Sequence, residues 1–524
     1  MQRKVLSICL LLLPLMLMAA PITQEQAKQK ASEFMTGHPK MAKGRMLKAA
    51  KAPLKMQQAE TAASYYVFNV GEQEGFIVVS GDDRTPAILG YAVGGSFDAA
   101  NIPANMQAWL QGYEDQISKL DQYPAAQTSV ASHEAIAPLI KSTWGQGAPY
   151  NLMCPIDPTN NEGSYSGCVA TAMAQVMNYY KYPEMTTAAI PAYTTDYYGF
   201  SMRAIAKTTI DWDNMLDQYD ESATEAQQQA VAQLMLLCGQ SVKMDYTAYG
   251  SYTYSNYVTT ALSKYFGYDK NVHYAIRNLY RAAEWDNLIY QELQEGRPVI
   301  YRGSSLRDGH AFIIDGYSED GLYHVNWGWY GNYDSYFLLS VLDPSVEGDN
   351  TTISPDAFNF YQEAVVGIQK PTEAEPSEDA LALVTDYLII DAYETEFERQ
   401  ADSTFVLPVY ISMVNLTATT RSFDIGCGIY NDQNEQVEAV KLFTKRNLAY
   451  YDYAWNSVTL TLPATLPDGT YSIKAVSRPI NTDKWLIGTG DFEYYIGLTI
   501  KDNVAYTSSF GTFDLSGTIV STIE

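Results

Sequence analysis

The segment KPTEAEPSED, which begins at Lys370, most constrains the fold, because it has the composition of an acidic, proline-bearing linker. The residues before it are rich in tyrosine, glycine and tryptophan and hold the densest motifs. After it, short strand patterns alternate with turns, as at residues 405–414. The sequence therefore predicts a main domain at residues 131–370, a linker at 371–379 and an all-β, sandwich-like domain at 380–524.

The first residues have the pattern of an export signal. Arg3 and Lys4 precede a largely apolar stretch, and Ala19 and Ala20 supply small residues for cleavage. An uncleaved membrane anchor is the alternative, but the stretch is short for a bilayer span. We therefore expect a signal peptide at residues 1–19 and a protein that is secreted or carried on a cell surface, with no membrane span.

Residues 20–130 predict a separate α+β unit ahead of the main domain. Strand patterns at residues 65–70, 76–80 and 88–93 are separated by glycine-bearing turns. They precede an amphipathic helix that carries Trp109 on its apolar face. The unit thus has enough apolar residues for a core of its own.

Charge and composition exclude several classes of protein. Lysine and arginine total 34 against 60 aspartates and glutamates, a net charge of −26, which disfavours binding to nucleic acid. The five cysteines are too few for a disulfide scaffold. Basic residues gather at 28–55, which suits docking on the acidic remainder. Residues 122–135 are small and polar and predict an exposed, cleavable connector.

The first chemical motif is GCVATAMAQVMNYYKYP at residues 167–183. Its apolar residues recur at helical spacing, and Pro183 ends the pattern. Cys168 falls at the predicted helix N-terminus, where the helix dipole and unpaired N–H groups favour a thiolate. A small buried cysteine is the structural alternative. The glycine before Cys168 and the polar loop preceding it favour an accessible nucleophile.

The second motif is DGHAFIIDGYSEDGLYHVNWGW at residues 308–329. It predicts a β-hairpin in which His310 opens the first strand and Asn326 lies close to opposite it on the returning strand. An asparagine carbonyl beside an imidazole holds its tautomer, and Trp327 would cover that contact from water. A cysteine nucleophile needs such a base and orienting group from distant sequence. No metal-binding or cofactor-binding motif occurs, so we expect no cofactor.

These motifs, with FIVVSGDDRTPAILGYAVGGSFD at residues 76–98 and WGQGAPYN at 144–151, resemble the streptopain family of secreted cysteine peptidases. The resemblance covers about residues 25–370. It implies an α+β fold: a papain-like cysteine peptidase domain preceded by an inhibitory α+β propeptide. It further implies a zymogen that hydrolyses peptide bonds in protein or peptide substrates through a cysteine–histidine thioester mechanism, with its own propeptide as intramolecular inhibitor.

The resemblance also implies roles for individual residues. Cys168 matches the nucleophile, His310 the general base and acid, and Gln146 a glutamine that donates to the oxyanion. Asn326 and Trp327 match the residues that orient and shield the histidine.

Three further positions match the substrate cleft of the family. Gly309 matches a residue that lines it, and Ser251 and Tyr252 fall in its loop, where smaller residues are usual. Two other classes stay open: a related amidase or transglutaminase, and a surface adhesin that retains a peptidase domain. Intact Gln146, Cys168 and His310 argue against a decayed site.

Overall fold

The computed structural model describes most of the chain between residues 21 and 509. The described ranges are 21–38, 47–49, 64–118, 120, 133–277, 282–304, 309–339, 362–378, 380–400, 404–417, 419–433, 435–450, 452–488 and 495–509. The predicted signal peptide at 1–19 and most of the predicted connector at 122–135 lie outside them.

The N-terminal region combines a meander of strands with two helices. Its elements are α1 Gln24–Gly37, β1 Leu47–Ala49, β2 Tyr65–Val70, β3 Phe76–Ser80, β4 Ile88–Ala92 and α3 Ala104–Ser118. Thr23 and Gln26 begin α1 with a reciprocal capping box, which satisfies two backbone N–H groups. Strands β2 to β4 correspond to the three predicted strand patterns, and they pair antiparallel in sequence order.

The central region has a helical half and a sheet half. The helical half contains α4 Cys168–Tyr180, β5 Tyr193–Thr194, β6 Ser201–Met202, the 3-10 helix η2 Trp212–Asn214, α5 Glu225–Ser241 and α6 Tyr257–Phe266. The sheet half contains β7 His273–Ile276, α7 Ala282–Gln294, β8 Val299–Ser304, β9 Gly309–Tyr317, β10 Tyr323–Asn326, β11 Ser335–Phe337 and β12 Glu363–Val366. Helix α4 is buried along most of its length and packs on β9, so its N-terminus lies where the two halves meet.

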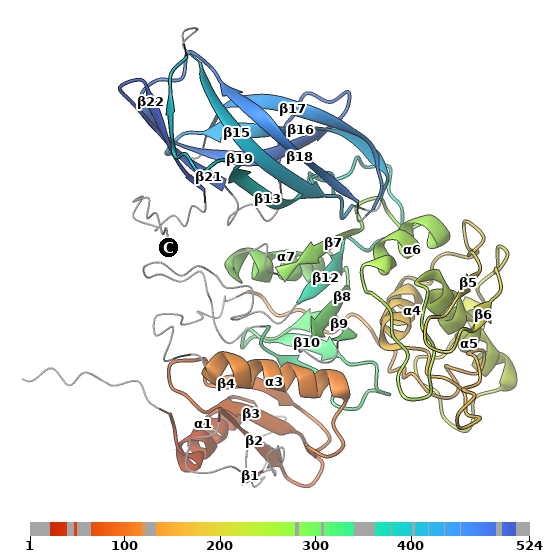
Figure 1. Ribbon diagram of the computed structural model, residues 1–524. Coiled ribbons are helices and arrows are strands. Elements are labelled where there is room, and N and C mark those ends of the chain that lie inside the picture. The colour runs from red at the N-terminus through yellow and green to blue at the C-terminus, as the bar shows by residue number, and fades with distance from the viewer. Residues whose placement is uncertain are drawn as a thin grey trace, which may run out of the picture.

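One antiparallel sheet joins the N-terminal region to the central region. Its strand order is β1-β2-β3-β4-β11-β10-β9-β8-β12-β7, and the join is the pairing of β4 with β11. Gly90 permits the close approach, because a Cβ there would lie 2.4 Å from the Phe337 ring. Helix α3 lies over β8 and β9, covering the face of the shared sheet (Figure 1).

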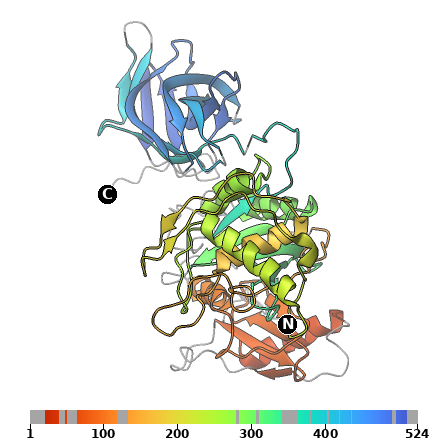
Figure 2. The same cartoon turned by 90° about the vertical axis from the view of Figure 1, so that its right-hand side faces the viewer.

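The C-terminal region is all β, as predicted. Its elements are β13 Val384–Ile390, β14 Glu396–Glu398, β15 Phe405–Val414, β16 Arg421–Tyr430, β17 Gln436–Leu448, β18 Tyr453–Leu462, β19 Gly469–Pro479, β20 Leu486–Ile487, β21 Tyr495–Lys501 and β22 Val504–Ser509. A three-stranded and a larger sheet enclose one apolar core. Figure 2 shows this sandwich at one end of the molecule and the N-terminal strands at the other.

Candidate active site

Cys168 is the first residue of α4 and stands out among the cysteines of the described residues. It is partly exposed, whereas Cys154, Cys238 and Cys427 are buried. Burial raises the pKa of the Cys154 and Cys427 thiols to about 12, so both stay protonated and inert near neutral pH. Cys168 is therefore the accessible candidate nucleophile.

Glycine is required immediately before Cys168. Gly167 is the N-cap of α4 with φ +90°, a conformation that favours glycine, and no side chain caps the helix there. A Cβ on Gly167 would lie 2.5 Å from the Met244 methyl carbon and 3.2 Å from the Ser251 carbonyl oxygen. The turn thus packs tightly against the loop that carries Ser251.

The thiol of Cys168 lies against the start of β9. The Ala311 N–H donates to its Sγ over 3.4 Å, and Ala311 follows His310 directly. Burial raises the pKa of the thiol, while the N–H groups of Ala311 and Val169 oppose that shift by favouring the thiolate. The structure therefore brings together the cysteine and histidine that the two sequence motifs singled out.

His310 is the histidine that lies next to the Cys168 contact, since it precedes Ala311 on β9. It is partly buried in β9 and pairs with Gly303 of β8. Of the others, His38, His133 and His324 each lie within hydrogen-bond distance of a carboxylate, and His273 contacts a backbone carbonyl.

Gln146 is held beside the start of α4 through its backbone. Its carbonyl oxygen accepts from the N–H of Ser166 over 3.0 Å and from the Ser166 hydroxyl over 3.3 Å. Because Ser166 lies two residues before Cys168, this pairing brings Gln146 close to the thiol. The side chain of Gln146 is partly exposed, as a group that meets a substrate requires.

The expected position of Asn326 opposite His310 is wrong. Asn326 pairs with Ile313, three residues along β9 from the histidine. A register shift between His324 and Val325 moves the partner of Asn326 from Ile314 to Ile313, one residue nearer to His310, so the offset comes from the hairpin itself and not from the shift. The relation between Asn326 and the histidine is thus less direct than the sequence predicts.

The Asn326 side chain forms hydrogen bonds with α4 and with the segment that precedes Gln146. Its carbonyl oxygen accepts from the Gln175 amide over 3.1 Å and from the Gly328 N–H over 3.1 Å. Its amide donates to the Ser142 carbonyl over 3.0 Å. Asn326 therefore ties β10 to α4 and to the extended segment that leads to Gln146.

Trp327 is fully buried in the core of the shared sheet. Its ring lies 4.9 Å from that of Phe312 and 6.4 Å from that of Trp109 on α3, measured between centroids. Its backbone N–H donates to Asp334, and its carbonyl accepts from the Asn105 amide over 2.8 Å. Trp327 thus supports the loop after β10 and is also a contact of the N-terminal region.

The three predicted cleft residues differ in their surroundings. Ser251 is buried, and its hydroxyl donates to the Tyr165 carbonyl over 2.6 Å and accepts from the Thr247 N–H. Tyr252 is 56% exposed, so its ring is open to a ligand. Gly309 begins β9 and pairs with Ser304. Ser251 therefore stabilises the loop through hydrogen bonds, whereas Tyr252 exposes its ring to solvent.

Sequence analysis missed Gln175 and Tyr330. Gln175 is fully buried on α4, and its carbonyl oxygen accepts from the Trp144 N–H and the Ser142 hydroxyl, both over 3.1 Å. The available signal was a polar residue seven positions after Cys168, on the same face of an otherwise apolar helix. Tyr330 carried no comparable signal.

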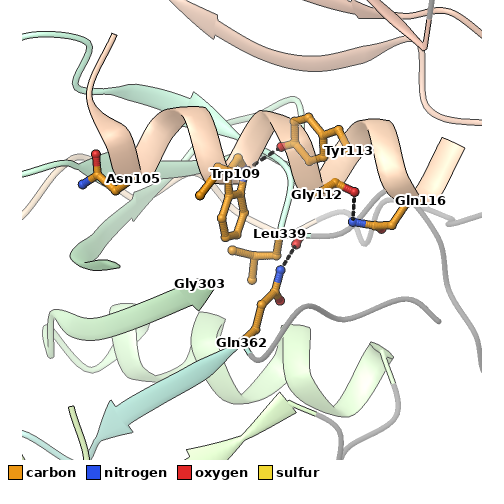
Figure 3. Close-up of a pocket in the computed structure, with 9 residues that line it drawn as sticks. Asn105, Trp109, Gly112, Tyr113, Gln116, Gly303, Leu339 and Gln362 are labelled. Atoms are coloured by element: carbon orange, nitrogen blue, oxygen red, sulfur yellow. Dashed lines mark hydrogen bonds between the residues drawn. The ribbon is translucent and has the colours of Figure 1, made fainter. Parts of the chain in front are cut away.

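Helix α3 covers the sheet beside the site. Trp109 lies 5.5 Å from Phe312 and 6.0 Å from Tyr301, ring centroid to centroid, in edge-on contacts. The contact between α3 and the sheet, here called the seam, leaves a cavity of about 20 Å³. It is lined by residues of α3 and β8 and by Leu339 and Gln362 (Figure 3). That volume holds about one water molecule, so the seam itself is closed to a peptide.

The described part of the chain offers neither a membrane-spanning helix nor a metal-binding cluster. None of its helices combines the length and the apolar character needed to cross a bilayer. No group of three or more histidine, cysteine, aspartate or glutamate side chains within it is arranged to hold a metal ion.

Comparisons with known proteins agree with this geometry. Residues 144–337 match the peptidase C10 family, and residues 19–117 match the Spi protease inhibitor family. The chain is 34% identical over 397 residues to the thiol protease/hemagglutinin PrtT of Porphyromonas gingivalis, covering 71% of this chain and 44% of PrtT. It thus spans less than half the length of that relative.

Two further relatives are covered more fully. A solved fragment of prointerpain A from Prevotella intermedia aligns with a TM-score of 0.52 and 32% identity, over 64% of this chain and 100% of the fragment. Streptopain of Streptococcus pyogenes is 37% identical over 336 residues, 59% of this chain and 81% of streptopain. With its accessible cysteine beside the histidine strand and an inhibitor domain in front, the chain belongs to the peptidase C10 family of cysteine peptidases.

Proposed function

We propose that Cys168 is the nucleophile, His310 the general base and acid, and Gln146 an oxyanion donor of a cysteine endopeptidase. The observation that carries the assignment is the contact between Cys168 Sγ and the N–H of Ala311, which follows His310. Asn326 and Trp327 are proposed to hold the loop after β10 in place. Gly309, Ser251 and Tyr252 are proposed to contribute to the substrate cleft.

The reaction is an acyl transfer to sulfur and then to water. His310 takes the thiol proton, and the thiolate of Cys168 attacks the scissile carbonyl carbon. The Cys168 N–H and the Gln146 amide stabilise the resulting oxyanion, and loss of one such donor typically costs about 10²–10³ in rate. His310 then gives the proton to the leaving amine, and water hydrolyses the thioester.

Substitution of Cys168 or His310 tests the roles proposed for them. Cys168→Ala and His310→Ala should each abolish hydrolysis of casein while the thermal unfolding midpoint stays near that of the parent, because both side chains lie at the cleft. Cys427→Ala is the matched control, since Cys427 lies in the core of the C-terminal sandwich. Peptide hydrolysis at the parental rate by either site variant would refute the assignment.

Labelling separates the peptidase from the alternatives. An epoxide inhibitor of cysteine peptidases should modify one thiol, that of Cys168, and stop casein hydrolysis. Incorporation of an amine into casein without cleavage would favour a transglutaminase. An unlabelled protein that still adheres to cells would favour an adhesin.

We further propose that the chain is made as an exported zymogen. The proposed parts are a signal peptide at residues 1–19, a propeptide at 20–130, the peptidase domain at 131–370, a linker at 371–379 and a β-sandwich-like domain at 380–524. The contacts of Asn105 and Trp109 with Trp327 support an inhibitor held on the peptidase. Sequencing of the N-terminus of the active form should give a start within residues 122–135, and a start near residue 21 would refute maturation.

A further inference from the structure

Tyr330 has a strained backbone in the loop between β10 and β11. Its φ is +57°, a left-handed conformation that is unusual for a large aromatic residue. Its side chain remains 45% exposed, so burial of apolar area does not explain its position. Strain of this kind persists only where surrounding contacts over-determine it, and it gathers at functional sites.

Those contacts are made with the two glycines that flank Gln146. An ideal Cβ on Gly145 would lie 2.4 Å from Cζ of the Tyr330 ring, and one on Gly147 would lie 2.6 Å from the Tyr330 hydroxyl oxygen. The Gly147 N–H donates to that hydroxyl over 2.9 Å. The Tyr330 N–H donates to the Trp144 carbonyl over 3.3 Å. The ring thus lies directly on the backbone, which only glycine permits.

The same short segment is held on its other side by the nucleophile helix. The Gln146 carbonyl accepts from Ser166, and the Trp144 N–H donates to Gln175 of α4. Residues 144–147 are therefore fixed between α4 and the loop that carries Tyr330. The backbone position of Gln146 depends on both sides.

We propose that Tyr330 is a positioning residue that fixes the oxyanion-donating amide of Gln146. This inference rests on the proposed role of Gln146. Oxyanion stabilisation depends on donors that are already aimed at the developing charge, and displacement by about 1 Å costs up to about 10²-fold in rate. Tyr330 meets this need by packing its ring on Gly145 and by pairing its hydroxyl with Gly147.

Single variants separate the ring from the hydroxyl. Tyr330→Ala should lower kcat about tenfold or more with little change in KM, because the lost interaction acts in the transition state. Tyr330→Phe should retain the ring contact and lose only a few-fold. Gly145→Ala should displace the ring and lower kcat as Tyr330→Ala does. Tyr179→Phe is the control, since Tyr179 is 37% exposed and its hydroxyl donates to a backbone carbonyl far from residues 144–147.

A double-variant cycle tests whether the effect passes through Gln146. Tyr330→Ala combined with Gln146→Ala should be within about twofold of Gln146→Ala alone, since residues that act as a unit are not additive. If the decrease in kcat of the double variant equals the product of the two single decreases, the proposal is overturned. If Gln146→Ala keeps the parental kcat, the role of Gln146 fails and the Tyr330 inference fails with it. In that case, loss of activity in Cys168→Ala would still support the proposed peptidase function.

A transition-state analogue gives a readout that a purely structural role would not move. A peptide aldehyde adds to the thiol and forms a tetrahedral oxyanion, so Tyr330→Ala should weaken its inhibition constant about as much as it lowers kcat. The affinity of a non-reactive peptide of the same sequence should stay within about twofold. The proposal would be overturned if the binding of both ligands weakened equally. It would also be overturned if a fall in the unfolding midpoint alone accounted for the lost activity.

Discussion

At the scale of single residues, buried amides align the segments of the active site. Gln175 shows this most clearly, because its one side chain meets the Trp144 N–H, the Ser142 hydroxyl and the Asn326 amide. A fully satisfied buried network rigidifies its surroundings, whereas a partly satisfied one is costly. Helix α4, the segment that leads to Gln146 and β10 therefore share one set of hydrogen bonds.

Removal of the Gln175 amide should damage both stability and rate. In Gln175→Met the buried Trp144 N–H loses its side-chain partner, which costs about 1–3 kcal/mol, while Asn326 keeps Gly328 and Ser142 as partners. Chemical denaturation measures the stability, and kcat should fall as the Gln146 segment loosens. Gln229→Met, at an exposed position of α5, is the matched control. Parental stability in Gln175→Met would contradict the network.

Asp334 makes the stability of the fold depend on pH. Burial raises the pKa of its carboxyl to about 7, above the value of about 3.9 for an exposed aspartate. Its neighbours are His324 and Asp315, and its Oδ1 accepts from the Trp327 N–H. The folded state therefore binds the proton more tightly than the unfolded state between about pH 4 and 7.

Protonation of Asp334 stabilises the folded state at low pH. The stabilisation is complete below about pH 4 and is lost as pH rises through about 7, so Asp334→Asn should gain stability relative to the parent over this window. The gain is at most about 1.4 kcal/mol for each pH unit. Denaturation at several pH values measures it, with Asp213→Asn at an exposed site as control. A difference that does not change with pH would contradict the raised pKa.

At the scale of elements, local patterns predicted the strands and helices better than their pairing. The apolar runs at β2, β3 and β15 gave those bounds without error, since most of their residues are buried. Strand β17 was missed because nearly all of its residues face solvent. The pairing of β4 with β11 rests on contacts far apart in sequence, and the register that sets Asn326 opposite Ile313 includes an irregularity, so no local pattern encodes either of them.

The pairing of β4 with β11 has a consequence for the mature enzyme. Loss of the N-terminal region would leave β11, Ser335–Phe337, at the edge of the sheet. A strand of three residues is a poor template for pairing with another chain. Removal of a paired neighbour therefore leaves only a short exposed edge.

Helix α3 should control how firmly the N-terminal region is held. Trp109→Ala removes ring contacts with Phe312, Tyr301 and Trp327, and truncation of a buried tryptophan costs about 3–5 kcal/mol. The purified variant zymogen should therefore mature faster, as followed by gel electrophoresis over time. Gln107→Ala, exposed on the same helix, should mature at the parental rate. A slower Trp109→Ala zymogen would argue against this docking role.

At the scale of the whole molecule, the C-terminal sandwich is fastened to the peptidase and not merely tethered. The Tyr274 N–H of β7 donates to the Leu416 carbonyl over 3.3 Å, and the Ser377 N–H donates to the Asn271 side chain over 2.7 Å. Val414 and Leu416 belong to the same apolar cluster as the helical half of the peptidase. The two parts therefore share a core at their junction.

That shared core predicts how the two parts unfold. In the zymogen with Cys168→Ala, which cannot digest itself, the peptidase and the sandwich should unfold in one calorimetric transition. Leu416→Asp places an uncompensated charge in the junction, which is strongly destabilising, and should divide the transition into two. Val406→Asp, at a 38% exposed position of β15, should leave one transition. Two transitions already present before the change at Leu416 would show that the junction does not couple the parts, and the sandwich would then be an independent module behind the linker.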